Sequence, residues 1–205
     1  KEFPLGNFRD RTEEAQPIIR MPADFSTEAI TEQFSLETIS LQEPFFEPEF
    51  GHVGIKIAGF GGQGVLSAGI VLVRAGARAR RHVSWLPSYG PEQRGGTANC
   101  GVVLSGEPVG SPVVYYPDVL VAMNQPSFER FAGDVREGGV LLYDSEMGPM
   151  AVPAGVRGIP VPARQIALES GSDKAANTAM LGVLAELGVT RLPDEVFADA
   201  VAEAF

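Results

Sequence analysis

The sequence is poor in the residues from which many metal and redox sites are built. Its 205 residues contain one cysteine and two histidines. The single cysteine, Cys100, excludes an internal disulfide, a cysteine-ligated iron-sulfur cluster and a cysteine zinc site within this chain. We therefore interpret Cys100 as a small buried residue and expect a reducing, cytoplasmic compartment.

Positive charge and long apolar runs are also scarce. The chain has 16 Lys and Arg against 26 Asp and Glu, which gives a formal net charge of -10. This excess of negative charge argues against binding nucleic acid by general electrostatic attraction. No apolar run approaches the roughly 20 residues that cross a bilayer, so we expect no membrane span.

The first 50 residues differ in composition from the rest. They hold 4 Lys and Arg against 11 Asp and Glu, together with 5 prolines and few consecutive apolar residues. This composition predicts an extended acidic arm over residues 1–50, with one short helix in "STEAITEQF". A solvated linker is the alternative. The folded domain is then expected to occupy residues 51–205.

From Gly51 onward, segments with strand and helix patterns alternate. Strands are predicted at 52–58, 82–87, 97–105, 117–123, 138–145 and 156–162, and helices at 65–79, 125–135, 163–170, 173–188 and 194–205. Strands separated by helices predict an α/β fold. We expect a three-layer α/β/α arrangement with a mostly parallel, Rossmann-like sheet, preceded by the N-terminal arm.

A glycine-rich loop, "GFGGQG", lies between the first of these strands and the first helix. Gly59, Gly61 and Gly64 have the G-x-G-x-x-G spacing in the strand-to-helix context that gives this motif its meaning. Glycine permits positive φ and close backbone approach, and the helix start offers free N–H groups to a phosphate. The loop therefore predicts a nucleotide-like diphosphate ligand, with a ligand-free tight crossover as the alternative.

The residues about 20 positions after this loop separate two nicotinamide cofactors. A site for NAD usually has an acidic residue there to hold the ribose. This chain instead has Arg78, Arg80 and Arg81. NAD is thereby disfavoured, whereas NADP stays open because an arginine can meet a 2'-phosphate. Complementing the negative end of the preceding helix is the other interpretation of these arginines.

A second polar loop, "SYGPEQRGGTANC", precedes the third predicted strand. Glu92 and Arg94 supply opposite charges that can pair with each other, with a partner or with a ligand. Gly95 and Gly96 let another backbone or a cofactor come close. A solvated connection is the alternative interpretation.

One buried amide and two histidines complete the polar residues of interest. Asn177 shares a helical face with Leu181 and Leu184, so we expect it to be buried and hydrogen-bonded, either to a nearby loop or to a ligand. His52 and His82 lie in or beside strands without a recognisable nucleophile motif. No hydrolytic site is therefore predicted.

The two loops together, "GFGGQG" and "SYGPEQRGGTANCGVVLS", resemble the gamma subunit or gamma domain of 2-oxoacid:ferredoxin oxidoreductases. These enzymes act on pyruvate, 2-oxoglutarate, branched-chain oxoacids such as ketoisovalerate, and indolepyruvate. The resemblance extends over residues 53–205 and includes "PDVLVAMNQPSFERF", "GGVLLYDS" and "VPARQIALESGSDKAANTAMLGVLAEL". The arm segment "KEFPLGNFRDRTEEAQPI" resembles the C-terminal tail of the thiamine-diphosphate-binding beta subunit. We therefore expect a piece of a beta-gamma fusion that continues beyond residue 205.

The resemblance implies a reaction and a division of labour. The family converts a 2-oxoacid and coenzyme A to acyl-CoA and CO2, with reduction of ferredoxin. Thiamine diphosphate, Mg2+ and iron-sulfur clusters are expected only on the alpha, beta and ferredoxin-like delta partners. This chain is expected to bind coenzyme A and to support assembly, without catalysis of its own. The implied cofactor-binding residues are Gly59, Phe60, Gly61, Gly62, Gln63, Gly64, Glu92, Arg94, Gly95 and Gly96.

Individual roles within this set also follow from the resemblance. The glycines admit the ligand to the backbone, and Gln63 donates a hydrogen bond. Arg94 stabilises phosphate charge or an inter-subunit contact, with Glu92 orienting it. An NADP-dependent reductase domain and a purely structural assembly module remain the alternative functions.

Overall fold

The computed structural model describes residues 51–89, 97–172 and 175–204. The predicted arm over residues 1–50, with its short helix, lies outside the described residues. The same holds for most of the second polar loop, including Glu92, Arg94, Gly95 and Gly96. The predictions for these segments therefore stay predictions.

Six strands form a single sheet in the order β2-β3-β1-β4-β5-β6. They are β1 (His52–Phe60), β2 (His82–Tyr89), β3 (Thr97–Ser105), β4 (Val119–Ala122), β5 (Val140–Asp144) and β6 (Arg157–Val161). Parallel pairs join β1 to β4, β4 to β5 and β5 to β6. Among the described strands, β3 alone has the opposite direction, and it pairs antiparallel with both β1 and β2. The prediction of a mostly parallel sheet is confirmed.

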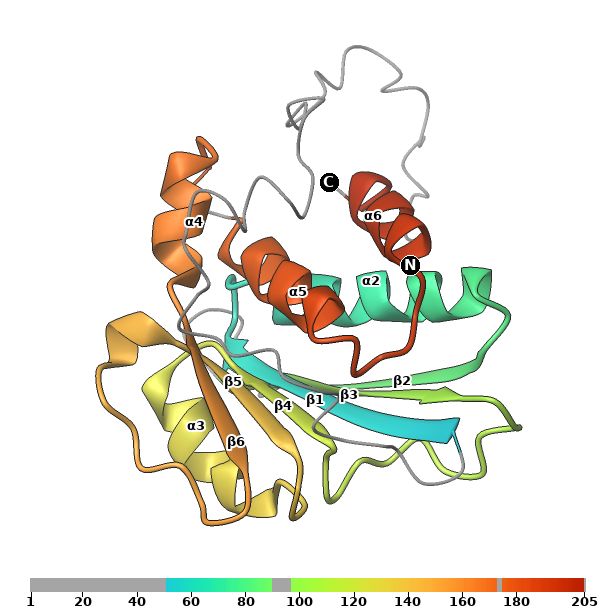
Figure 1. Cartoon of the computed structure of the whole chain (residues 1–205), viewed down its shortest axis with the longest axis horizontal. Helices are drawn as coiled ribbons and strands as arrows, with labels where there is room; N and C mark the ends of the chain where they lie inside the picture. The colour runs from blue at the N-terminus through green and yellow to red at the C-terminus, as the bar shows by residue number, and fades with distance from the viewer. Residues whose placement is uncertain (1–50, 90–96, 173–174, 205) are drawn as a thin grey trace, which may run out of the picture.

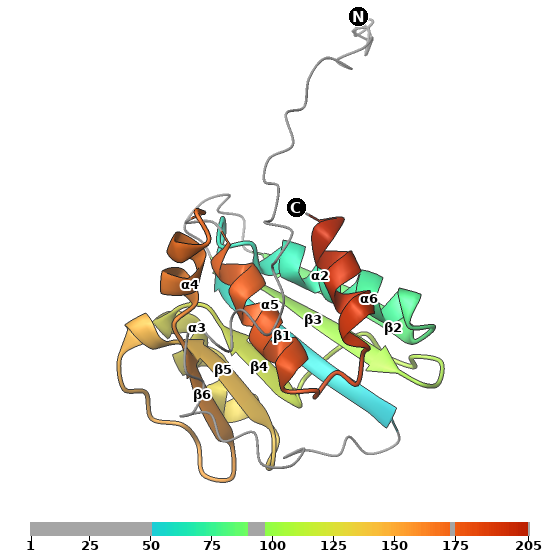
Figure 2. The same cartoon turned by 45° about the horizontal axis from the view of Figure 1, so that its top comes forward.

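Helices cover both faces of the sheet, which confirms the three-layer prediction. The helices are α2 (Val65–Arg78), α3 (Gln125–Phe131), α4 (Ala163–Glu169), α5 (Ala176–Glu186) and α6 (Asp194–Ala202). Figures 1 and 2 show α2, α5 and α6 side by side over one face, with α4 beside α5 and α3 on the opposite face. Two short 3-10 turns, Ala132–Asp134 and Ser145–Met147, follow α3 and β5.

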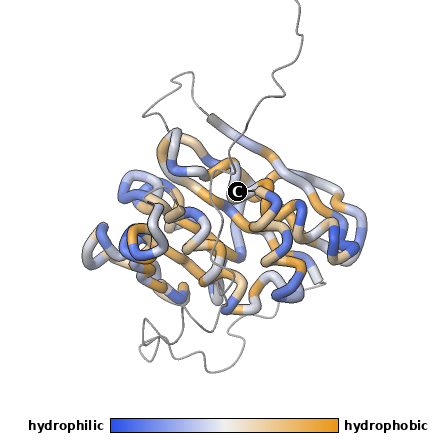
Figure 3. Tube along the Cα trace, turned by 90° about the horizontal axis from the view of Figure 1, so that it is seen from above, coloured by the Kyte–Doolittle hydropathy of each residue, from blue (hydrophilic) through white to orange (hydrophobic). Residues whose placement is uncertain are grey.

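The core has two parts, one on each face of the sheet. The larger lies between the sheet and α2, α5 and α6, and it includes the fully buried Leu72, Leu181 and Leu184. The smaller lies under α3 and includes Phe128 and Tyr143, whose rings meet edge to face at 5.4 Å. In Figure 3 hydrophobic and hydrophilic residues alternate along much of the chain, as expected where one side of an element meets the core and the other meets solvent.

Helix α2 packs closely against the sheet because two of its buried residues are glycines. A Cβ placed on Gly69 would lie 2.6 Å from Cys100 Sγ, and one placed on Gly76 would lie 2.6 Å from a methyl group of Leu104. Larger residues would push the helix away from β3. This close contact fixes the distance between α2 and strands β2 and β3.

Candidate functional site

A pocket of about 470 Å3 opens at the edge of the sheet where the parallel strands β1, β4 and β5 end. The loops after these strands form most of its wall, and the first residues of α4 and α5 complete it. The lining residues are Gly62, Gln63, Met123, Asn124, Gln125, Asp144, Glu146, Met147, Arg164 and Ala176.

The topology explains why a pocket forms at this place. Strands β1 and β4 are parallel neighbours, yet α2 follows β1 on one face of the sheet and α3 follows β4 on the other. The two connections diverge and leave a crevice at the carboxyl ends of the strands. In open α/β sheets this is the usual position of a ligand site.

The glycine loop contributes to the pocket through Gly62. This residue is exposed and has φ 98°, a left-handed conformation that favours glycine. A Cβ at Gly62 would meet nothing within 4 Å, so the space above its backbone is open. Gly61 is exposed beside it.

The outer glycines of the motif serve packing within the protein. A Cβ on Gly59 would lie 2.8 Å from Gln63 Oε1 and 3.1 Å from Met123 Cβ. Gly64 has φ 74°, and its Cβ would lie 2.8 Å from Asn177 Cγ. Both positions therefore need glycine because any larger residue would clash with side chains of the protein itself.

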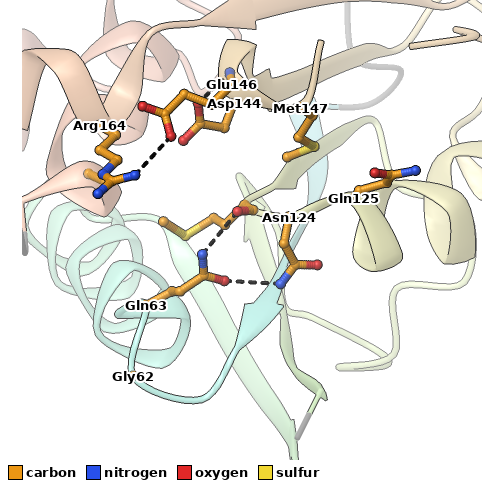
Figure 4. A pocket seen from close by; sticks show the side chains of 10 residues that line it. Gly62, Gln63, Asn124, Gln125, Asp144, Glu146, Met147 and Arg164 are labelled. Atoms are coloured by element: carbon orange, nitrogen blue, oxygen red, sulfur yellow. Dashed lines mark hydrogen bonds and ion pairs between the residues drawn. The ribbon is translucent and has the colours of Figure 1, made fainter. Parts of the chain in front are cut away.

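Gln63 joins the loops that follow β1 and β4 (Figure 4). Its Oε1 accepts hydrogen bonds from the Phe60 N–H at 2.7 Å and from Asn124 Nδ2 at 3.0 Å, and its Nε2 donates to the Met123 carbonyl at 3.0 Å. Asn124 also begins α3, because its Oδ1 accepts from Ser127 N at 2.9 Å. Gln63 thus holds the glycine loop in place, and the hydrogen bond to a ligand expected of it stays a prediction.

Asn177 lies directly behind the glycine loop. It is 2% exposed, as predicted, and its Nδ2 donates to the Gly64 carbonyl at 3.2 Å. The interpretation as a cap for a nearby loop is therefore confirmed. Its Oδ1 is buried without a hydrogen-bond partner in the described part of the chain. A buried amide oxygen of this kind can accept a hydrogen bond from an incoming group.

The wall opposite the glycine loop is charged. Asp144 ends β5, and its Oδ1 accepts from Glu146 N at 3.0 Å. Burial raises the pKa of the Asp144 carboxyl, and the nearby Glu146 charge acts in the same direction, against the hydrogen bond and Arg164. Glu146 Oε2 lies 3.3 Å from Arg164 Nη1. These three residues and Asn124 were not among the residues predicted from the sequence. Their positions at or just after predicted parallel strands were the feature of the sequence that could have identified them.

The arginines on which the NADP alternative rests do not line the pocket. Arg78 ends α2, at the opposite end from the glycine loop, and pairs with Asp199 of α6 at 3.4 Å and with Glu203 just after that helix. Arg81 lies before the amino end of β2, and its Nη2 donates to the Arg191 carbonyl at 3.4 Å. Arg78 and Arg81 therefore contact other parts of the chain, α6 and the Arg191 loop.

The residues that the structure describes contain neither a cluster of metal ligands nor a membrane-spanning helix. These residues hold no group of three or more His, Cys, Asp or Glu side chains that could bind a metal ion. None of the described helices has the length and apolar character needed to cross a membrane. His52 and His82 are both exposed.

The sequence matches one protein-family profile, described as pyruvate ferredoxin/flavodoxin oxidoreductase, over residues 54–205. The chain is 56% identical over 201 residues to ketoisovalerate oxidoreductase subunit VorA of Methanothermobacter marburgensis. That alignment covers 98% of this chain and 42% of the relative. The chain thus spans about two fifths of this relative's length.

Solved structures share the fold. The gamma subunit of keto/oxoacid ferredoxin oxidoreductase from Geobacter sulfurreducens superposes with a TM-score of 0.61 and 28% identity, over 74% of this chain and 85% of that one. A second structure is a 2-oxoglutarate:ferredoxin oxidoreductase from Magnetococcus marinus, solved with 2-oxoglutarate, coenzyme A and succinyl-CoA bound. It superposes with a TM-score of 0.59 and 27% identity. The match covers 77% of this chain and 30% of that one.

Proposed function

The chain belongs to the pyruvate ferredoxin/flavodoxin oxidoreductase family, and we propose that it is the coenzyme A-binding gamma domain of a 2-oxoacid:ferredoxin oxidoreductase. The whole complex oxidatively decarboxylates a 2-oxoacid, transfers the acyl group to coenzyme A and reduces ferredoxin. Identity to a ketoisovalerate oxidoreductase subunit favours a branched-chain 2-oxoacid. Alpha, beta and delta partners supply thiamine diphosphate, Mg2+ and the iron-sulfur clusters.

The observation that carries this proposal is the pocket at the start of α2. The first N–H groups of a helix lack partners within the helix, and α2 begins beside the open backbone of Gly62. The positive end of the helix dipole favours a diphosphate such as that of coenzyme A. The amides of Asn124 and Gln125 and the side chains of Met123 and Met147 offer polar and apolar contacts to the rest of the ligand.

The proposed role is to bind and position coenzyme A for chemistry on the partners. The titratable lining residues of the pocket are Asp144, Glu146 and Arg164, and two of these pair with each other. No described serine, cysteine or histidine lines this pocket to act as a nucleophile. The predicted contributions of Glu92 and Arg94, which precede β3, belong to the same proposal.

A substitution of Gly62 tests this function. Gly62→Val places a branched side chain in the open space at the pocket and strains a backbone of positive φ. We expect the KM for coenzyme A of the complex to rise at least about tenfold, since the ligand loses close backbone approach. The KM for the oxoacid should change little. The measurement is steady-state reduction of ferredoxin by the purified complex.

Gly138→Val is the matched control. Gly138 also has positive φ, 78°, and open space for a Cβ, but it lies before β5 at the opposite edge of the sheet. Its substitution should give the same backbone strain without a change in the KM for coenzyme A. If both variants leave that KM unchanged in an intact complex, the pocket does not bind coenzyme A. Loss of assembly in the Gly62 variant alone would favour the structural assembly role.

A further inference from the structure

Arg164 is the one cation among the side chains that line the described pocket. It lies in the first turn of α4, which follows β6, and its side chain is 61% exposed. Figure 4 shows it on the side of the pocket away from Gly62, directed toward Glu146. The glycine loop contains no lysine or arginine. Within the described wall of the pocket, a full positive charge therefore comes from Arg164.

The contact between Arg164 and Glu146 is weak enough to be exchanged. It is a single approach at 3.3 Å, and the Glu146 side chain is 53% exposed. Exposed ion pairs of this kind contribute little to stability. An arginine that binds a phosphate through two parallel hydrogen bonds has a considerably more favourable interaction free energy. Both side chains are more than half exposed, so Arg164 can leave the Glu146 carboxylate without a change in the core.

The balance of charge also favours this exchange. Asp144 and Glu146 bring two carboxylates to the wall, against the one guanidinium of Arg164. A ligand with a diphosphate at the start of α2 and a further phosphate elsewhere would meet net negative charge there. Moving Arg164 from Glu146 to that second phosphate would offset part of its negative charge.

We propose that Arg164 binds the 3'-phosphate of coenzyme A and exchanges the Glu146 carboxylate for it. This inference rests on the proposed function, in which coenzyme A occupies the pocket with its diphosphate at α2. The 3'-phosphate is a monoester that carries about -1.5 to -2 charges near neutral pH, as other phosphate monoesters do. It is the remaining anionic group of the ligand. Arg164 thus distinguishes coenzyme A from its dephosphorylated form.

The test measures the affinity of the purified complex for coenzyme A and for 3'-dephospho-CoA by calorimetry, without oxoacid. The unsubstituted complex should bind coenzyme A more tightly. Arg164→Gln should weaken coenzyme A binding by about 10- to 100-fold, as expected for loss of a charge-assisted phosphate contact, and should leave dephospho-CoA binding within about twofold. Glu146→Gln should strengthen coenzyme A binding, because it removes the competing carboxylate.

A control separates this role from a general change in charge. Arg130→Gln removes an exposed arginine on α3 that pairs with Asp134 at 3.9 Å, outside the pocket lining. It should change neither affinity. Equal affinities of the unsubstituted complex for the two ligands, or equal losses for both in Arg164→Gln, would overturn the assignment of Arg164. Failure of Gly62→Val to weaken either ligand would instead overturn the coenzyme A site itself.

Discussion

Gly64 shows how one glycine of a motif can serve a neighbouring side chain. The G-x-G-x-x-G spacing predicts close approach of a ligand, yet at Gly64 the nearest group is the Asn177 amide, and at Gly59 it is Gln63. Among the four glycines of the loop, the one that lines the described pocket is Gly62, which occupies a variable position of the motif. The spacing locates the loop correctly, but it does not say which glycine faces the ligand, because Asn177 lies more than 100 residues away in sequence.

At the residue scale, Cys100 should be chemically inert in the folded protein. It is fully buried, and burial raises the pKa of its thiol to about 11. At pH 8 only about one thiol in a thousand would be ionised, and the thiolate is the reactive form. We expect a disulfide reagent to label the native chain at least about 100-fold more slowly than the chain in guanidinium, where one thiol should react at once. Equally fast labelling of native protein would contradict this burial.

At the scale of elements, apolar patterns predicted nearly every strand and helix, but not their directions. Strand β4 is a continuous apolar run without alternation, because all four of its residues are buried, as is usual for a parallel strand covered on both faces. The antiparallel direction of β3 depends on the hairpin with β2 and its insertion beside β1, which leave no mark in either strand's pattern. For the same reason the pocket wall from Asn124, Asp144 and Arg164 could not be assembled from one local motif.

Close packing of α2 on the sheet gives a prediction for this element. Gly76→Ala would place a methyl group 2.6 Å from Leu104 Cδ2 and 2.7 Å from Val83 Cγ1. Overpacking of a core costs about 1–3 kcal/mol, which exceeds the gain of about 1 kcal/mol from alanine's helix propensity. We expect a lower free energy of unfolding in urea titrations monitored by circular dichroism.

Gly133→Ala supplies the comparison for that measurement. A Cβ at Gly133, in the turn after α3, meets nothing within 4 Å, and its φ is not positive. This change should leave the free energy of unfolding unchanged or slightly raised. A stability loss of the same size in both variants would show that the contact of α2 with β3 is not responsible.

At the scale of the whole molecule, the negative charge and the pocket are linked. The chain carries a net charge of -10, and Asp144 and Glu146 add two carboxylates to the wall of the pocket that we propose binds an anionic ligand. On that proposal, the wall would repel the ligand except near the start of α2 and Arg164. The folded protein thereby gives up some electrostatic stability at its site, as functional sites often do.

The electrostatic cost of the Asp144 carboxylate should be measurable in the pH dependence of stability. Burial raises the pKa of the Asp144 carboxyl above its value in the unfolded chain, so the folded state holds this proton more tightly. Linkage then requires its contribution to stability to be greatest below the unfolded pKa and to fall as pH rises to the folded pKa. Asp144→Asn keeps an oxygen for Glu146 N and removes the titration. We expect its midpoint of thermal unfolding to exceed that of the unsubstituted chain at pH 7 and to converge with it as pH falls toward 4. A difference that grows on acidification would mean that the Asp144 carboxylate stabilises the fold.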